Sequence, residues 1–443
     1  MRLALNSLVE RARSSLFLVP MVGVVVAVAL AAATLAVDQQ LDPATADLPL
    51  GLTSTVESAR AILSTIAGAT ITVAAISFSV SLLILQQAAT QYSPRVVQTL
   101  FRDPFNKRVM GIVVGTFTYC LVVLRSVRSA LEEGGSPVVP NLSVAIAVLL
   151  GVITILAIVA FIDHSAHSMD VSRILDDIRR RAIDQIRREW TPAADGRTVS
   201  ADRPGPTRDP GSPECAAFEV RFDTDGWVQE IDVDALVAVV PAGALMHLQT
   251  GPGRFAVTGS LICTLSAVPE DPVAVCTAVR DAVDVGNTRT MRQDVSFGLR
   301  QLSDVALRAL SPGINDPTTA QDAIFHSAAV LAEALRHDPP SAPVAEGRGR
   351  LVIEHGPDHR DLVEVAFSET RQAASGVVTV STYLLGAMGQ VDDALRAEGL
   401  TDRSGVLQEQ ADLVLTACRR AAILPADLER VERAYDRNFG PGA

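Results

Sequence analysis

Four polar side chains recur at seven-residue intervals within a long apolar segment of this sequence. Thr65, Thr72, Ser79 and Gln86 lie in residues 61–94, which contain no Asp, Glu, Lys or Arg. Because seven residues make close to two helical turns, these side chains share one face of a helix. One interpretation is that small and hydroxyl side chains let neighbouring helices pack closely. The other is that this stripe lines a hydrated path, as in a channel or transporter.

Three arginines precede a polar turn in the second half of the chain. Arg289, Arg292 and Arg300 come before the motif SPGINDP, which contains Asn315 and Asp316. Guanidinium groups bind anions through paired hydrogen bonds, so one interpretation is an anion or ligand pocket in which the arginines face this motif. The alternative is an elbow between two helices. There, Asn315 and Asp316 satisfy free backbone groups and the arginines tie adjacent helices together.

No recognisable catalytic set accompanies these groups in the sequence. His326 follows the polar turn but has no obvious nucleophile or acid to work with. The five cysteines are scattered without a CxxC pair, which fits a reduced cytoplasm and gives no thiolate metal site. We therefore expect a protein that is not an enzyme, with no metal and no cofactor.

Four apolar segments must position the polar stripe. They cover about residues 16–37, 61–87, 109–127 and 142–162, and each is near or above the length of roughly 20 residues that crosses a bilayer. The first could instead be a cleaved signal peptide, although it is longer than the apolar part of such peptides. Since no segment has an ionisable residue near its middle, a proton- or sodium-coupled transporter is disfavoured, whereas a passive pore is not.

Charge in the connecting loops predicts the orientation in the membrane. The loop after the second segment has four basic residues against one acidic residue, namely Arg95, Arg102, Lys107, Arg108 and Asp103. By the positive-inside rule this loop and the N-terminus face the cytoplasm, and four crossings return the C-terminal part to the same side. We therefore expect a multi-pass protein of the bacterial inner (plasma) membrane with both termini cytoplasmic. The net charge of −12 argues against nucleic acid as the main partner.

The fold class expected is an α-helical membrane protein with an α+β cytoplasmic region. Residues 251–261 resemble the hairpin of barrel-sandwich domains of the lipoyl and biotinyl carrier type. Since residues 214–272 contain no Lys to modify, that likeness implies a structural β module and not a carrier. The expected divisions are a transmembrane domain (1–163), an amphipathic helix and linker (164–213), a small β-rich module (214–272) and a helical cytoplasmic domain (273–443).

Several segments together carry a family resemblance. They are residues 59–95, 101–125, 226–232 (GWVQEID), 252–259 (PGRFAVTG) and 289–320. Together they resemble the bacterial predicted-membrane-protein family known as domain of unknown function 2254, over roughly residues 10–435. The resemblance implies a multi-pass inner-membrane protein with a cytoplasmic C-terminal region. It implies no activity, cofactor or catalytic residue.

Two functions follow as hypotheses. The first is an oligomeric ion channel or pore in the lipid bilayer, built from several copies of the chain. In it the Thr65–Thr72–Ser79–Gln86 stripe lines the path, and the cytoplasmic domain assembles or gates it. The second is a non-transporting membrane scaffold or sensor whose cytoplasmic domain binds a protein or small ligand near Arg289, Arg292 and SPGINDP.

Overall fold

The computed structural model describes most of the chain, which divides into two compact units between Asp170 and Val171. The described ranges are 18–40, 55–91, 104–127, 140–167, 170–193, 217–340, 350–353, 356, 358–421 and 423–440. Most of the basic loop 95–108 and of the linker 191–213 lies outside these ranges.

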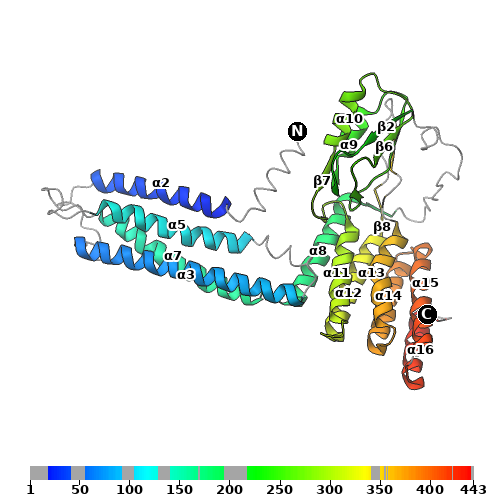
Figure 1. Ribbon diagram of the computed structural model, residues 1–443. Coiled ribbons are helices and arrows are strands. Elements are labelled where there is room, and N and C mark those ends of the chain that lie inside the picture. The colour runs from blue at the N-terminus through cyan, green and yellow to red at the C-terminus, as the bar shows by residue number, and fades with distance from the viewer. Residues whose placement is uncertain are drawn as a thin grey trace. The chain divides into compact units, whose positions relative to one another are not determined.

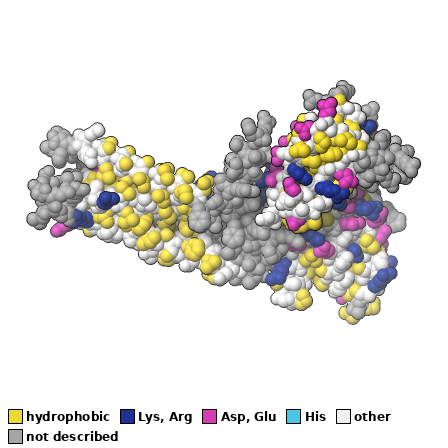
Figure 2. Space-filling model, turned by 45° about the horizontal axis from the view of Figure 1, so that its top comes forward, with side chains coloured by type: hydrophobic (Ala, Val, Ile, Leu, Met, Phe, Trp, Pro, Cys, Tyr) yellow, Lys and Arg dark blue, Asp and Glu magenta, His cyan; other side chains and the backbone are white. Residues whose placement is uncertain are grey.

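Among its described residues, the first unit contains four helices that are long and apolar enough to cross a membrane, as the sequence predicts. They are α2 (Leu18–Gln40), α3 (Val56–Gln91), α5 (Pro104–Ser126) and α7 (Asn141–His167) (Figure 1). Their exposed side chains are largely Val, Leu and Ile, and apolar atoms cover much of the surface of this unit in Figure 2. Such a surface suits a hydrocarbon solvent.

Helix α5 is the central member of this four-helix bundle. It packs against α2, α3 and α7, and 44% of its membrane-crossing window is buried, compared with 17% for α2 and α3 and 22% for α7. The bundle core includes Leu63, Tyr119 and Val123, all fully buried. The other three helices therefore present most of their surface outward.

Glycines allow α2 and α5 to approach backbone to backbone. A Cβ atom added at Gly23 would lie 2.6 Å from the carbonyl oxygen of Gly111, and one at Gly115 would lie 3.2 Å from the carbonyl oxygen of Gly23. Gly111 and Gly115 are four residues apart, so they occupy one face of α5. This is the small-xxx-small pattern by which membrane helices gain van der Waals contact.

Polar groups inside the bundle are hydrogen-bonded to one another. The Tyr119 hydroxyl donates to the Ser143 carbonyl oxygen at 3.1 Å and pairs with the Thr34 hydroxyl at 3.0 Å. The Asp38 carboxylate, near the end of α2, accepts bonds from the backbone N–H groups of Leu142 and Ser143, each at 3.0 Å. It therefore caps the start of α7, where free N–H groups favour an anion.

The second unit begins with α8 (Val171–Glu189), and its described residues include one sheet of four strands and one of three. One sheet has the strand order β2 (Phe218–Arg221), β6 (Leu261–Leu265), β4 (Leu245–Leu248), β9 (Arg350–Ile353). The other has the order β5 (Phe255–Ala256), β3 (Gly226–Ile231), β7 (Val283–Gly286). With α9 (Val233–Val239) and α10 (Pro272–Asp281), these strands enclose one apolar core, and we call them the β region.

The β region takes strands from well beyond residue 272. Strand β9 pairs in parallel with β4, so that Leu245 lies opposite Arg350 and Leu248 opposite Ile353. Strand β7 pairs antiparallel with β3. The sequence indicates helix after residue 273 because these strands are four residues long, which is too short for a clear alternating pattern.

Helices make up most of the remaining described part of the second unit. They are α11 (Val295–Ala309), α12 (Pro317–Leu335), α13 (His359–Ala374), α14 (Val378–Ala397), α15 (Gly405–Arg420) and α16 (Pro425–Phe439), with a 3-10 turn η2 (Thr401–Arg403). Together with α8 they pack side by side (Figure 1). Two short strands, β1 (Thr191–Pro192) and β8 (His337–Asp338), pair at the ends of α8 and α12.

Candidate functional site

The polar stripe lies on the exposed side of α3. Thr65, Thr72, Ser79 and Gln86 are all exposed in the single chain, as are Gly68 and Ala75 between them. A Cβ atom added at Gly68 would meet nothing within 4 Å. The four side chains predicted from the sequence therefore share one face, and that face points away from the other helices of its own bundle.

The opposite face of α3 makes the contacts inside the bundle. Ala59, Leu63 and Ala67 are buried there, and so are Thr70 and Ser77, each 4% exposed. Because this packing face and the stripe are on opposite sides, the stripe contributes nothing to the packing of its own chain.

Hydroxyl groups of the stripe are bonded to their own helix. Thr72 Oγ1 donates to the Gly68 carbonyl oxygen and Ser79 Oγ to that of Ala75, both at 2.9 Å. These bonds satisfy each hydroxyl proton, so the groups can face an apolar neighbour at modest cost. The oxygen lone pairs still point outward and can accept a hydrogen bond or contact a cation.

In the second unit, Arg289 lies between two aromatic rings and a buried carboxylate. Its guanidinium is 5.8 Å from the centre of the Trp227 ring and 5.5 Å from that of Phe297. It also donates to both carboxylate oxygens of Asp294, at 2.5 and 3.1 Å. The Asp294 side chain is 2% exposed. Burial raises the pKa of the Asp294 carboxyl, and the Arg289 guanidinium opposes that shift.

Glycine is required beside this ion pair. Gly253 has φ +82°, and a Cβ atom there would lie 2.1 Å from Asp294 Oδ2. The turn before β5 therefore packs its backbone directly onto the carboxylate that caps α11. Any larger residue at Gly253 would both strain the turn and displace the ion pair.

The two residues before Asp294 join the same loop to strand β3. Arg292 contacts the carboxylates of Glu230 at 3.1 Å and Asp284 at 3.0 Å. The Gln293 amide accepts from the Ile231 N–H at 2.8 Å and donates to the Ile231 carbonyl oxygen at 3.2 Å. The Gln293 side chain thus pairs with β3 as the backbone of a neighbouring strand would. We call the set of contacts around Arg289, Arg292 and Asp294 the junction.

The remaining candidates lie elsewhere on the helices. Arg300 pairs with Glu369 of α13 at 2.6 Å. Asn315 and Asp316 lie beyond the other end of α11, which at 15 residues is about 22 Å long. The structure therefore does not gather Arg289, Arg292 and Arg300 around SPGINDP, because α11 separates that motif from Arg289 and Arg292.

The SPGINDP motif forms the turn between α11 and α12. Asn315 has φ +49°, a left-handed conformation that Asn tolerates better than most residues. Asp316 caps α12 by accepting bonds from the N–H groups of Thr318 and Thr319, both at 3.1 Å. Bonds from the Thr319 hydroxyl and these N–H groups hold the pKa of Asp316 below its ordinary value.

Trp227, Gly253 and Asp294 join three separated segments, and the sequence did not single them out as a site. Each lies in a segment that carries the family resemblance, namely GWVQEID, PGRFAVTG and the stretch from residue 289. Their presence in three segments that share the family resemblance is the sequence feature that could have indicated this site. Within the described ranges, no three His, Cys, Asp or Glu side chains are grouped as a metal would require.

Comparison with known proteins gives a consistent picture. The family described as "Predicted membrane protein (DUF2254)" matches residues 13–390. The uncharacterized proteins Rv1290c of Mycobacterium tuberculosis and Mb1321c of Mycobacterium bovis are each 31% identical over 373 residues, which is 82% of this chain and 68% of theirs. No solved structure matches the chain.

Proposed function

Because this chain belongs to the DUF2254 family of predicted membrane proteins, we propose that it is an oligomeric ion channel or pore of the inner membrane. Copies of α3, one from each subunit, would surround the path with the stripe of Thr65, Thr72, Ser79 and Gln86 facing it. The second unit would hold the subunits together or gate the path.

The observation that carries this proposal is the position of the stripe. Elsewhere the exposed surface of the membrane helices is mostly apolar, as with Val25 of α2 and Leu156 of α7, each 63% exposed, and most of its polar residues, such as Gln40 and Asp163, lie near helix ends. Small and polar side chains gain nothing by facing lipid tails, whereas they suit a second helix or water. Their position opposite the packing face of α3 therefore favours a neighbour that is not part of the same chain.

The chemistry of the stripe suits weak contact with a passing ion. Thr72 and Ser79 present oxygen lone pairs while their protons are held by the backbone. The stretch between Arg60 and Arg95 carries no formal charge, so an ion would meet dipoles and not a fixed counter-charge. Contacts of this kind are weak enough to let an ion leave, as conduction requires.

A non-transporting scaffold or sensor is the second candidate. The same internal bonds of Thr72 and Ser79 favour it, because hydroxyls satisfied in this way also serve simple helix packing between subunits. In this case the stripe would be buried in a water-free interface between the α3 helices of neighbouring subunits. The second unit would then bind the partner protein or ligand. A ligand at Arg289 would have to displace its ion pair with Asp294, and one at Arg292 would have to displace Glu230 or Asp284.

Ion flux from liposomes containing the purified protein tests the pore. Replacing Thr72 and Ser79 together with Leu removes both oxygens from the stripe and should reduce flux to that of empty liposomes. The matched control replaces Ile71 and Phe78 with Leu, since both are exposed on α3 but lie to one side of the stripe. This control should conduct like the original protein.

Assembly is measured in the same preparations by crosslinking. Flux that is unchanged in the Thr72→Leu/Ser79→Leu protein would reject the pore-lining role of the stripe. Liposomes that stay tight with the original protein, across several ions and pH values, would favour the scaffold or sensor.

For orientation, we propose that the N-terminus, the loop of residues 95–108 and the second unit face the cytoplasm. The support is the excess of basic residues in that loop. A reporter that is active only outside the inner membrane should work when inserted within residues 130–137 and not when fused at the C-terminus. The opposite pattern would reverse the orientation.

A further inference from the structure

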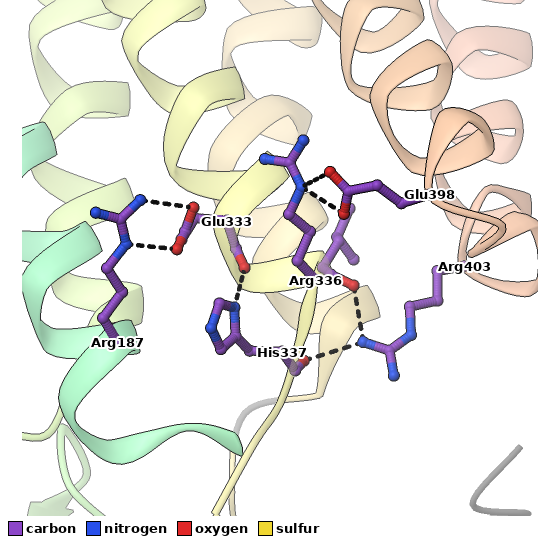
Figure 3. A network of polar contacts seen from close by, with 7 residues as sticks. Arg187, Glu333, Arg336, His337, Glu398 and Arg403 are labelled. Carbon is purple, nitrogen blue, oxygen red and sulfur yellow. Dashed lines mark hydrogen bonds and ion pairs between the residues drawn. The ribbon is translucent and has the colours of Figure 1, made fainter. Parts of the chain in front are cut away.

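The C-terminal end of α12 forms a corner in which several side chains converge on free carbonyl groups. The last carbonyls of a helix have no partner within it and need donors from elsewhere. Arg403 donates to the Leu335 carbonyl oxygen at 2.7 Å, and the His337 ring bonds the Glu333 carbonyl oxygen at 2.8 Å. Figure 3 shows this corner, with Arg187 and Glu333 paired on one side and Arg336 and Glu398 on the other.

Two donors meet at a single carbonyl oxygen in this corner. His359 Nε2, from the start of α13, lies 2.9 Å from the His337 carbonyl oxygen, and an Arg403 guanidinium nitrogen lies 3.1 Å from it. The oxygen can accept only from Nε2–H, so the neutral His359 ring carries its proton there. A second proton would place a full positive charge beside a guanidinium that already binds the same oxygen.

The carboxylates facing His359 are engaged elsewhere. Asp338 pairs with Arg403, whose side chain is only 14% exposed. Asp358 accepts from the Asp361 N–H at 2.7 Å and so caps α13. Trp190, 6% exposed, covers the ring from the end of α8, with the two ring centres 6.4 Å apart. A protonated His359 would therefore find little new compensation in the closed corner.

We propose that this corner is a proton-sensitive clasp, closed while His359 is neutral and loosened when His359 takes up a second proton. The clasp holds β1 against β8, where Thr191 pairs with Asp338 and the Ala193 N–H donates to the Arg336 carbonyl oxygen at 2.9 Å. Strand β1 follows directly from α8, and α8 begins four residues after the last residue of α7. Loosening it would free the chain that leaves the membrane-connected helix.

The direction of the pH effect follows from the environment of the ring. Burial lowers the pKa of His359 below its ordinary value, and Arg403 lowers it further, while the bond to the His337 carbonyl and the nearby carboxylates of Asp338 and Asp358 oppose the shift. Since the folded state disfavours the charged form, closure of the clasp is complete above about pH 6.5. Closure then weakens as the pH falls toward the lowered value.

One effect works against the clasp, because the carboxyl end of a helix favours a positive charge. Arg403 already supplies that charge at the end of α12, through its bonds to the Leu335 and His337 carbonyl oxygens. A second positive charge on His359 would gain little further stabilisation from the end of α12, whereas it would bear the full free-energy cost of desolvation.

Hydrogen–deuterium exchange of the full-length protein in lipid nanodiscs tests the clasp. Peptides covering residues 190–193, 333–338 and 359–362 should exchange faster at about pH 5.5 than at about pH 7.5, on the order of threefold or more after correction for intrinsic rates. Peptides of α11 should keep one corrected rate at both pH values, which distinguishes local loosening from general acid unfolding.

The key variant is His359→Gln, because a glutamine amide can still donate to the His337 carbonyl oxygen and does not titrate. It should exchange slowly in these peptides at both pH values. The matched control is His326→Gln. The His326 ring bonds the Asp322 carbonyl of its own helix and interacts electrostatically with Asp176 of α8, away from the His337 carbonyl. That variant should retain the full pH effect.

The proposal is overturned if His359→Gln retains the pH effect or if the original protein shows none. It is also overturned if α11 loosens in parallel with the corner. Should His359→Gln fail to fold, the comparison of corner and α11 peptides in the original protein still decides. The test is independent of ion flux, so its failure leaves the proposed pore untouched.

Discussion

Arg289 and Asp294 are the pair on which the junction depends most. The sequence indicates that charges in this stretch pair with one another, but it does not say which. The structure joins Arg292 to Glu230, 62 residues away, and leaves Asp294 to Arg289. The Arg292–Glu230 pair cannot be read from spacing along a helix, because the two residues are far apart in the chain and are brought together by the fold of the β region.

Replacing Arg289 with Ala should destabilise the second unit. Asp294 would remain buried without its cation, and the expected cost is about 3 kcal/mol of unfolding free energy. Denaturant titration followed by tryptophan fluorescence measures this, since both tryptophans, Trp190 and Trp227, belong to this unit.

The control for that experiment is Arg360→Ala. Arg360 and Glu409 form an ion pair in which both side chains are about half exposed, so its loss should leave the unfolding midpoint unchanged. Equal loss of stability in the two variants would mean that burial of Asp294 is not what makes the first pair important.

At the scale of helices and strands, the membrane spans could be predicted and their ends could not. A run of apolar residues is a local property, so all four spans were found from composition. The expected spans 16–37 and 61–87 leave residues 38–60, with their charged side chains, between two helices. Asp38 instead lies within α2 and caps α7, and Arg60 lies within α3 and donates to the Val127 carbonyl oxygen at 2.9 Å. These two charged side chains therefore form hydrogen bonds with backbone groups at the ends of neighbouring helices.

Close packing of α2 on α5 should be sensitive to one methyl group. Gly23→Ala would place its Cβ against the backbone of Gly111, which cannot rotate away, and should cost about 1–3 kcal/mol. A thermal-shift curve of the detergent-solubilised protein should move to lower temperature.

Gly151→Ala is the matched change on α7. Its Cβ would meet the Ile66 side chain at 3.4 Å, an ordinary contact, and alanine favours helix over glycine. This protein should be at least as stable as the original. If both glycine variants behaved alike, the α2–α5 contact would not be as close as described.

For the whole molecule, the central feature is the contrast between the two faces of α3. Periodicity placed Thr65, Thr72, Ser79 and Gln86 on one face, and the structure shows that this face is exposed. The sequence could not tell the packed face from the exposed one, because Thr70 and Ser77 on the other side are equally polar and yet buried. The two faces of α3 are distinguished only by the position of α5 and α7, which pack against one of them. The β region shows the same limit, since β9 joins β4 from more than a hundred residues away.

The most direct test of the proposed pore is the aqueous access of position 72. In a background with all five native cysteines replaced by Ala, Thr72→Cys should react with a charged, membrane-impermeant methanethiosulfonate reagent, and the reaction should block flux. Ile71→Cys, about 100° around the helix and facing lipid in the proposed pore, should stay unmodified because a thiol needs water to ionise. Modification of Ile71→Cys but not of Thr72→Cys, or of neither, would contradict a path lined by this stripe.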